Sequence, residues 1–93
     1  MNLKVIWTAK FKKDYKLAIK RGLNINLLDD AIRLLAKAGS LPEQYSDHAL
    51  QGEFKGFREC HIEPDWLLIY AIENNKLYLT LSRTGTHSDL FKK

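Results

Sequence analysis

The chain contains three histidines, which are the side chains best suited to exchanging protons near neutral pH. His61 opens the stretch HIEPDW, in which Asp65 and Trp66 follow a proline. His48 lies upstream of this stretch and His87 lies downstream. Because the unperturbed pKa of histidine is about 6.5, each ring can act as an acid or as a base. Three imidazoles and a carboxylate could therefore carry out acid–base chemistry if the fold brings them together.

Cleavage of RNA without a metal ion is one reaction that such groups could perform. A base must take the proton from a ribose 2′-hydroxyl, an acid must protonate the departing 5′-oxygen, and cations must stabilise the phosphorane. The histidines suit both proton transfers. Asp65 could act as a base if its pKa were raised, or it could orient an imidazole. Arg83 carries a permanently charged guanidinium that matches phosphate oxygens.

Aromatic side chains close to these groups could hold an unpaired base by stacking. Trp66, Tyr70 and Phe91 are the candidates, since stacking tolerates many sequences and is typical of single-strand recognition. Trp66 and Tyr70 are also natural core residues, whereas Phe91 lies near the C-terminus and is harder to explain as core. A lone histidine is more often structural than functional, so the functional interpretation depends on convergence of all three.

A metal site is a less favoured alternative, although three histidines, or two with an aspartate, can bind zinc. The sequence has no tight spacing such as H-E-x-x-H, and the basic surroundings would oppose a cation. We therefore expect no metal and no other cofactor. Cys60 is the single cysteine and is expected in the core; neither it nor Ser82 or Ser88 lies in a recognisable nucleophile motif.

Positive charge is concentrated in the first part of the chain. Residues 1–21 carry seven lysines and arginines against one aspartate, whereas the net charge of the whole chain is +4. Lys12, Lys16 and Lys20 follow at four-residue spacing and so form a stripe on one face of a helix. Such a stripe could bind a phosphate backbone or an acidic protein, but a solvated helix face explains the charge equally well.

The expected elements define an α+β fold in the order β-α-α-β-β-β. Apolar residues at three- and four-residue spacing predict the helices, and β-branched and aromatic runs predict the strands. The helices are expected at residues 9–21 and 26–38, and the strands at residues 3–7, 57–63, 66–73 and 77–83. We expect a small twisted antiparallel sheet packed on an N-terminal helical hairpin, with residues 1–93 forming one domain.

The turn at Pro64 and Asp65 decides which side chains share a face of the sheet. With these two residues in the central turn positions, Glu63 pairs with Trp66 and His61 pairs with Leu68. Opposed residues share a face. Cys60, Ile62, Leu67, Ile69 and Ala71 are then expected toward the helices, and Glu59, His61, Leu68 and Tyr70 on the other face.

The register of the last strand is open. A two-residue turn at Asn74-Asn75 would place Leu77, Leu79 and Leu81 on the face of His61, whereas a three-residue loop would bury them under the helices. Burial of three leucines favours the longer loop. Arg83 would then point inward, so a bulge or the end of strand pairing must rotate it if it joins the site.

No window of the sequence approaches the roughly 18 apolar residues of a membrane span. The N-terminus also lacks the order of charged, apolar and small residues that marks a signal peptide. A single cysteine agrees with a reducing compartment. We therefore expect a cytoplasmic protein with no membrane partner.

Two strings in the second half of the chain resemble the YafQ branch of the RelE-like toxins of bacterial toxin–antitoxin modules. They are GFRECHIEPDWLLIY, residues 56–70, and LSRTGTHSDLF, residues 81–91. The upstream strings HALQG, residues 48–52, and FKKDYK, residues 11–16, fit the same family. The resemblance extends over nearly the whole chain and implies a RelE-like fold.

The resemblance also implies an activity and a set of site residues. Toxins of this family are endoribonucleases that enter the ribosomal A site and cut mRNA during translation without a metal. The implied roles are acid–base catalysis for His48, His61, Asp65 and His87, phosphate binding for Arg83, and placement of the RNA for Trp66 and Phe91. We favour His87 as the acid and Asp65 or His61 as the base.

The partners implied by the resemblance are the 70S ribosome with its mRNA and an acidic DinJ-like antitoxin that covers the site. Operator DNA would be bound only through the antitoxin, and the basic helix with Lys12 and Lys16 would help to hold ribosomal RNA. The main alternative is a non-catalytic binder or a ParE-like toxin, which shares the fold but acts on DNA gyrase. The four titratable residues argue against this alternative, since a binder needs no such groups.

Overall fold

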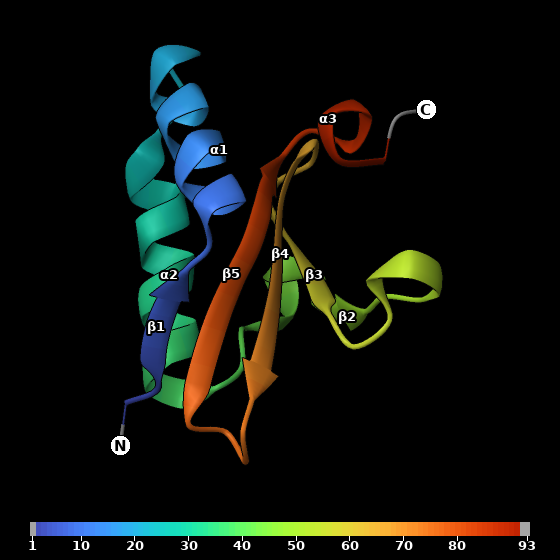
Figure 1. Ribbon diagram of the computed structural model, residues 1–93. Coiled ribbons are helices and arrows are strands. Elements are labelled where there is room, and N and C mark those ends of the chain that lie inside the picture. The colour runs from blue at the N-terminus through green and yellow to red at the C-terminus, as the bar shows by residue number, and fades with distance from the viewer. Residues whose placement is uncertain (1, 92–93) are drawn as a thin grey trace.

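The computed structural model describes residues 2–91 of the chain. Its strands are β1 (Lys4–Trp7), β2 (His48–Ala49), β3 (Arg58–Glu63), β4 (Trp66–Glu73) and β5 (Tyr78–Gly85), and its α-helices are α1 (Ala9–Lys20), α2 (Ile25–Ala38) and α3 (His87–Phe91). Short 3-10 turns cover Glu43–Tyr45 and Gly52–Phe54. The helices α1 and α2 lie side by side against the sheet, and α3 lies at the opposite side near the end of β5 (Figure 1). The predicted α+β class and helical hairpin are confirmed.

The five strands form one sheet in the order β1-β5-β4-β3-β2. Three neighbouring pairs are antiparallel, but β1 runs parallel to β5, so the sheet is mixed rather than wholly antiparallel. The pairing of the first strand with the last follows from the path of the chain around the helical hairpin. Neither β2 nor α3 was predicted, because elements of two and five residues are too short to show a periodic pattern.

Local capping explains where the two long helices begin and end. The hydroxyl of Thr8 accepts a hydrogen bond from the amide of Phe11 and caps α1, as the sequence predicts. Asn24 caps α2 in the same way through the amide of Asn26. Gly39 ends α2 in the left-handed region at φ 71°, a conformation that glycine adopts without steric cost. None of the helices within residues 2–91 is long and apolar enough to cross a membrane.

The main core lies between the helical hairpin and the sheet. Its buried members are Phe11, Ala18, Leu28, Ile32, Leu35, Cys60, Trp66, Leu68, Tyr70, Leu79 and Leu81. Burial raises the pKa of the Cys60 thiol, which makes it a poor nucleophile and agrees with its expected core position. A smaller cluster on the opposite face of the sheet contains Leu67, Ile69 and Leu90, with Leu50, Phe54, Phe57 and Phe91 packed against it. Both faces of β4 are therefore covered.

A bulge in β3 changes the predicted register of the hairpin. Glu63 pairs with Trp66 as expected, but the pairing then shifts so that His61 lies opposite Leu67 and not Leu68. One extra residue on β3 moves the side chains of β4 to the other face. The prediction for β4 is therefore wrong: Leu68 and Tyr70 face the helices, while Leu67 and Ile69 face away, as the two clusters show.

The turn between β4 and β5 is longer than either alternative considered from the sequence. Glu73 pairs with Tyr78, and positive φ angles at Asn74, Asn75 and Lys76 close the turn. Leu79 and Leu81 are buried as expected, but Leu77 lies in the turn and is 54% exposed, so its predicted burial is wrong.

A bulge near Arg83, one of the two possibilities considered from the sequence, is present in β5. Leu81 pairs with Tyr70 and Arg83 pairs with Ile69, so Ser82 is the extra residue between them. Because of this extra residue, the alternation of side chains between the two faces of the sheet is interrupted at Ser82.

Candidate active site

The fold brings the three histidines into one row on the side of the sheet away from the helical hairpin. His48 comes from β2, His61 from β3 and His87 from the start of α3. The ring centroids of His48 and His61 are 6.2 Å apart, and those of His61 and His87 are 5.9 Å apart. Pairing of β2 with β3 and docking of α3 at the end of β5 produce this convergence.

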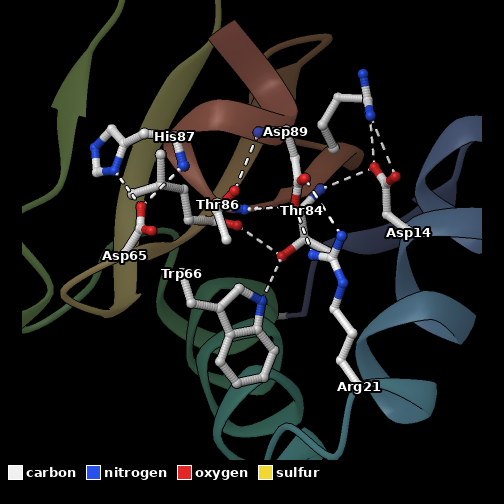
Figure 2. A network of polar contacts seen from close by, with 10 residues as sticks. Asp14, Arg21, Asp65, Trp66, Thr84, Thr86, His87 and Asp89 are labelled. Atoms are coloured by element: carbon white, nitrogen blue, oxygen red, sulfur yellow. Dashed lines mark hydrogen bonds and ion pairs between the residues drawn. The ribbon is translucent and has the colours of Figure 1, made fainter. Parts of the chain in front are cut away.

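The ring of His87 is oriented by Asp65. Its Nδ1 atom lies 2.6 Å from Oδ1 of Asp65, and the same oxygen accepts a hydrogen bond of 2.9 Å from the backbone amide of His87 (Figure 2). Bonding to the backbone amide, and then to the ring, lowers the pKa of Asp65 below its ordinary value. A carboxylate with a lowered pKa is a poor general base, so the contacts favour the orienting role for Asp65. The Nε2 atom of His87 is left for other partners.

Glu59 is a buried carboxylate beneath the histidine row. It is only 5% exposed, and its Oε1 atom lies 3.3 Å from Nε2 of His48. The sequence placed Glu59 on the face of His61 but did not single it out as a site residue. The two-residue spacing of Glu59 and His61 on one strand was the signal that could have identified it.

The ring of His61 lies at the centre of the row. Within residues 2–91, its buried Nδ1 atom has no hydrogen-bond partner, in contrast to Nδ1 of His87. Nothing in the described part of the chain therefore fixes the tautomer of His61 through that atom.

Three of these side chains also meet the geometric demands of a metal site. Glu59, His61 and His87 each offer one ligand atom, and these atoms all lie within 4.8 Å of one another. Two imidazoles and a carboxylate suit zinc or copper. The same arrangement suits proton transfer, so the geometry is compatible with both.

Phenylalanines form one wall beside His87. The ring centroids of His87 and Phe91 are 6.4 Å apart, and Phe91 contacts Phe54 edge to face at 5.6 Å. Phe91 is partly exposed, so a base next to His87 could stack on it.

Trp66 lies in the core, which was the alternative considered from the sequence. Its indole is 3% exposed and donates a hydrogen bond of 3.0 Å to the hydroxyl of Thr84, which in turn donates to the carbonyl of Leu67 (Figure 2). No open ring face is available for stacking on RNA. In this structure Trp66 instead links β4, which follows Asp65, to β5, which precedes His87.

Arg83 lies apart from the histidines, on the side of α1. Its Nε and Nη2 atoms donate to Asp14 at 2.7 and 3.2 Å, and the amide of Thr84 bonds to the same carboxylate at 3.1 Å. The hydrogen bond to Asp14 raises the pKa of Arg83, so the guanidinium stays charged. An incoming phosphate would have to share this group with Asp14.

The helix that carries His87 and Phe91 is tied to α1 by Asp89. The hydroxyl of Thr86 accepts from the amide of Asp89, and the carboxylate of Asp89 accepts from the amide of Thr86, both at 3.0 Å. Arg21, at the end of α1, donates to Asp89 at 2.7 Å (Figure 2).

Replacing Asp89 with asparagine should make the protein less stable in a pH-dependent way. The hydrogen bond from Arg21, followed by that from the amide of Thr86, lowers the pKa of Asp89 to about 2. Since the folded-state pKa is depressed, the stabilisation is present above pH ~4 and is lost as the pH falls toward ~2. We expect a loss of about 1 kcal/mol at neutral pH, after allowance for solvent screening.

Urea unfolding at a series of pH values measures this effect. Asp30→Asn is the matched control, because Asp30 forms an exposed ion pair with Arg33 on α2. A difference between Asp89→Asn and wild type that is the same at pH 7 and below pH 3 would contradict the role of the Asp89 charge.

The lysines of the predicted basic stripe are exposed on α1. Lys12 and Lys16 both point into solvent, and Lys16 borders a shallow hollow with Lys13 and Lys20. The lysine stripe therefore lies on α1, whereas the histidines lie on β2, β3 and α3. The lysines could bind one surface of a partner while the histidines bind another.

Comparison with known proteins gives consistent matches over almost the whole chain. The family model described as the bacterial toxin of type II toxin–antitoxin systems, YafQ, matches residues 3–92. The mRNA interferase toxin YafQ of Escherichia coli K12 is 46% identical over 86 residues, which cover 91% of each chain.

Two solved structures extend the likeness to three dimensions. The chain matches YafQ in the E. coli DinJ–YafQ toxin–antitoxin complex with a TM-score of 0.87 and 43% identity, covering 98% of this chain and 99% of that one. It matches a copper-bound mutant toxin from Helicobacter pylori with a TM-score of 0.88 and 40% identity, covering 96% and 99%. The chain therefore belongs to the YafQ family of toxins of bacterial type II toxin–antitoxin systems.

Proposed function

We propose that the protein is a single-domain mRNA interferase that cuts mRNA in the ribosomal A site by metal-independent acid–base catalysis and so stops translation. The observation that carries the proposal is the Asp65–His87 pair, which lies beside His61 and the buried carboxylate of Glu59. The curated E. coli relative is named an mRNA interferase toxin, which agrees with this chemistry.

The proposed reaction is an attack of the ribose 2′-oxygen on the adjacent phosphorus. His61 takes the proton of the 2′-hydroxyl, the bond between phosphorus and the 5′-oxygen breaks, and His87 gives its proton to that oxygen. Asp65 holds the ring of His87 during this transfer. The products are a 2′,3′-cyclic phosphate and a 5′-hydroxyl, so no water is consumed in the step.

The remaining site residues bind and place the RNA. His48 adds a further imidazole next to Glu59 and contributes positive charge when it is protonated. Arg83 provides a fixed positive charge for phosphate, shared with Asp14. Phe91 offers a partly exposed ring on which a base can stack beside His87.

We propose that the partners are the 70S ribosome with its mRNA and an acidic antitoxin of the DinJ type. A toxin that acts on translating ribosomes works in the cytoplasm. The E. coli relative has been crystallised with DinJ, which supports an antitoxin partner for this chain. Operator DNA would be bound only through that antitoxin.

Primer extension on an mRNA in a reconstituted translation system tests the proposal. Cuts in register with codons, seen only when ribosomes are present, are the expected result. Cuts on free RNA at equal rates would contradict dependence on the ribosome. A complete lack of cuts would contradict the enzyme itself and leave a non-catalytic or ParE-like toxin as the explanation.

Reversing the charge of Lys12 and Lys16 to glutamate should weaken binding to the ribosome. Each lysine that neutralises a phosphate contributes about one unit to the slope of log affinity against log salt, so the slope should fall by about 2. Sedimentation with ribosomes across a salt series measures it. Glutamate at Arg33 and Lys37, which are exposed on α2, gives the same charge change elsewhere. Equal losses in both double variants would rule out a specific contact through α1.

A chelator that removes transition metals but leaves Mg²⁺ should not change the rate of cleavage. Added Cu²⁺ should inhibit, because Glu59, His61 and His87 would hold the ion and could no longer transfer protons. A related toxin from H. pylori has been crystallised with copper bound. Cleavage that is lost with the chelator and restored by Zn²⁺ would contradict the metal-independent mechanism.

A further inference from the structure

The backbone that carries His48 is weakly held by its own strand. β2 has only two residues, His48 and Ala49, and both are exposed at the edge of the sheet. Within residues 2–91 the nitrogens of the ring have two polar contacts: Nδ1 lies 2.9 Å from the carbonyl of Ser46 and Nε2 lies 3.3 Å from Glu59. A two-residue edge strand leaves few backbone hydrogen bonds to fix such a ring.

Asp47, the residue just before His48, is anchored much more firmly. Its Oδ1 atom accepts a hydrogen bond of 2.7 Å from Nε of Arg58 on β3. Its Oδ2 atom accepts a hydrogen bond from the hydroxyl of Tyr70 on β4. Asp47, Tyr70 and Arg58 together form a clamp. The side chain of Asp47 is 14% exposed and Tyr70 is 1% exposed, so the bond between these two is largely shielded from water, whereas the side chain of Arg58 is 46% exposed.

The hydrogen bonds of the clamp are maintained because both donors keep their protons. Burial, followed by the hydrogen bond to Asp47, raises the pKa of Tyr70, so its hydroxyl stays protonated and remains a donor. The hydrogen bond to Asp47 likewise raises the pKa of Arg58. Hydrogen bonds to a charged, shielded acceptor are stronger than those between neutral groups. Without Asp47 the buried hydroxyl of Tyr70 would lose its acceptor.

The clamp and the histidine act on opposite faces of the sheet. Tyr70 belongs to the core under the helices, whereas His48 points to Glu59 and His61 on the other face. Consecutive residues of an extended chain point in opposite directions. Fixing Asp47 on one face therefore fixes the point from which His48 projects on the other.

We infer that Asp47 is a positioning residue, which acts through the clamp to Tyr70 and Arg58 and holds His48 against Glu59 and His61. The inference rests on the proposed cleavage of RNA for its catalytic consequence. It assigns Asp47 no contact with the substrate. The geometric part of the inference is that the clamp fixes the His48 ring, and this part does not depend on the reaction.

The first test compares cleavage rates with ribosome-bound mRNA. Asp47→Asn should lower the rate about tenfold to a hundredfold, since small displacements of a reacting group have effects of this size. Tyr70→Phe removes one of the two anchors and should have a smaller effect. Tyr15→Phe is the matched control, because Tyr15 donates to Asp29 at 2.7 Å between α1 and α2, away from the histidine row. It should cut within about twofold of wild type.

The second test asks whether Asp47 acts through His48. His48→Ala should lower the rate, and adding Asp47→Asn to that variant should lower it no further. If the two losses multiply, or if His48→Ala cuts as fast as wild type, the inference is wrong.

Nuclear magnetic resonance tests the geometric part without any activity. The contact between the rings of His48 and His61, whose centroids are 6.2 Å apart, should give cross-relaxation in wild type and Tyr15→Phe and lose it in Asp47→Asn. An unchanged contact in Asp47→Asn would overturn the inference. A wild-type protein that cuts no RNA would instead count against the proposed function, and the resonance measurement would still decide whether Asp47 fixes His48.

Discussion

Replacing His87 with alanine should lower the rate of mRNA cleavage by about 10²-fold to 10⁴-fold, the usual contribution of a general acid. His87 is the ring whose Nδ1 atom is held by Asp65, and its other nitrogen is left to protonate the departing oxygen. Without that proton the 5′-oxygen must leave as an alkoxide, which is a poor leaving group. Single-turnover cleavage of ribosome-bound mRNA measures the loss.

A substrate with sulfur in place of the bridging 5′-oxygen makes this test specific. A thiolate leaves without protonation, so His87→Ala should cut this substrate at nearly the wild-type rate. Affinity for the antitoxin should be almost unchanged, which shows that the variant is folded. Loss of cleavage of the sulfur substrate as well would contradict the role of His87 as the acid.

Replacing His61 with alanine should lower the rate of mRNA cleavage by a factor of the same size. The reason differs, because His61 removes the proton of the 2′-hydroxyl. The ring lies at the centre of the row, between those of His48 and His87. Asp65, the other base considered from the sequence, is a weaker candidate because bonding to His87 lowers its pKa. Asp65→Asn should therefore have a smaller effect than His61→Ala.

The sulfur substrate separates the two histidines. His61→Ala should remain slow on it, because removal of the 2′-proton is still required when the leaving group needs no acid. A His61→Ala variant that is rescued by the sulfur substrate would assign the acid role to His61. A variant that cuts normal mRNA at the wild-type rate would remove His61 from the mechanism.

The sequence predicted the helical hairpin well because its signals are local. Thr8 and Gly39 act within one helical turn, and the apolar spacing of each helix needs no knowledge of its neighbours. The pairing of β1 with β5 is different, because it joins the two ends of the chain. No local pattern specifies that contact.

The β3–β4 hairpin shows how one extra residue can reverse the predicted faces of a strand. The turn at Pro64 and Asp65 was placed correctly, since Glu63 does pair with Trp66. The bulge that follows shifts the register by one, and Leu68 and Tyr70 then face the helices. Alternation along a strand cannot reveal such a bulge when apolar residues occupy both faces of the next strand.

The candidate site was predicted in part for the same reason. The resemblance identified His48, His61 and His87, which the structure brings together. Glu59 was overlooked, because a charged residue on an edge strand is usually solvated. Its strand, β3, is not at the edge only because β2 pairs with it, and β2 was not predicted. The pairing of Arg83 with Asp14 was equally hidden, since the two residues are 69 positions apart.

The chemical ends of the RNA fragments test the central claim most directly. Fragments made by the purified toxin on ribosome-bound mRNA can be analysed by mass spectrometry. Attack by the 2′-oxygen predicts an upstream fragment that ends in a 2′,3′-cyclic phosphate, or the 3′-phosphate from its hydrolysis, and a downstream fragment that begins with a 5′-hydroxyl. An upstream 3′-hydroxyl with a downstream 5′-phosphate would show hydrolysis by water, as in metal-dependent nucleases, and would contradict catalysis by the histidine row.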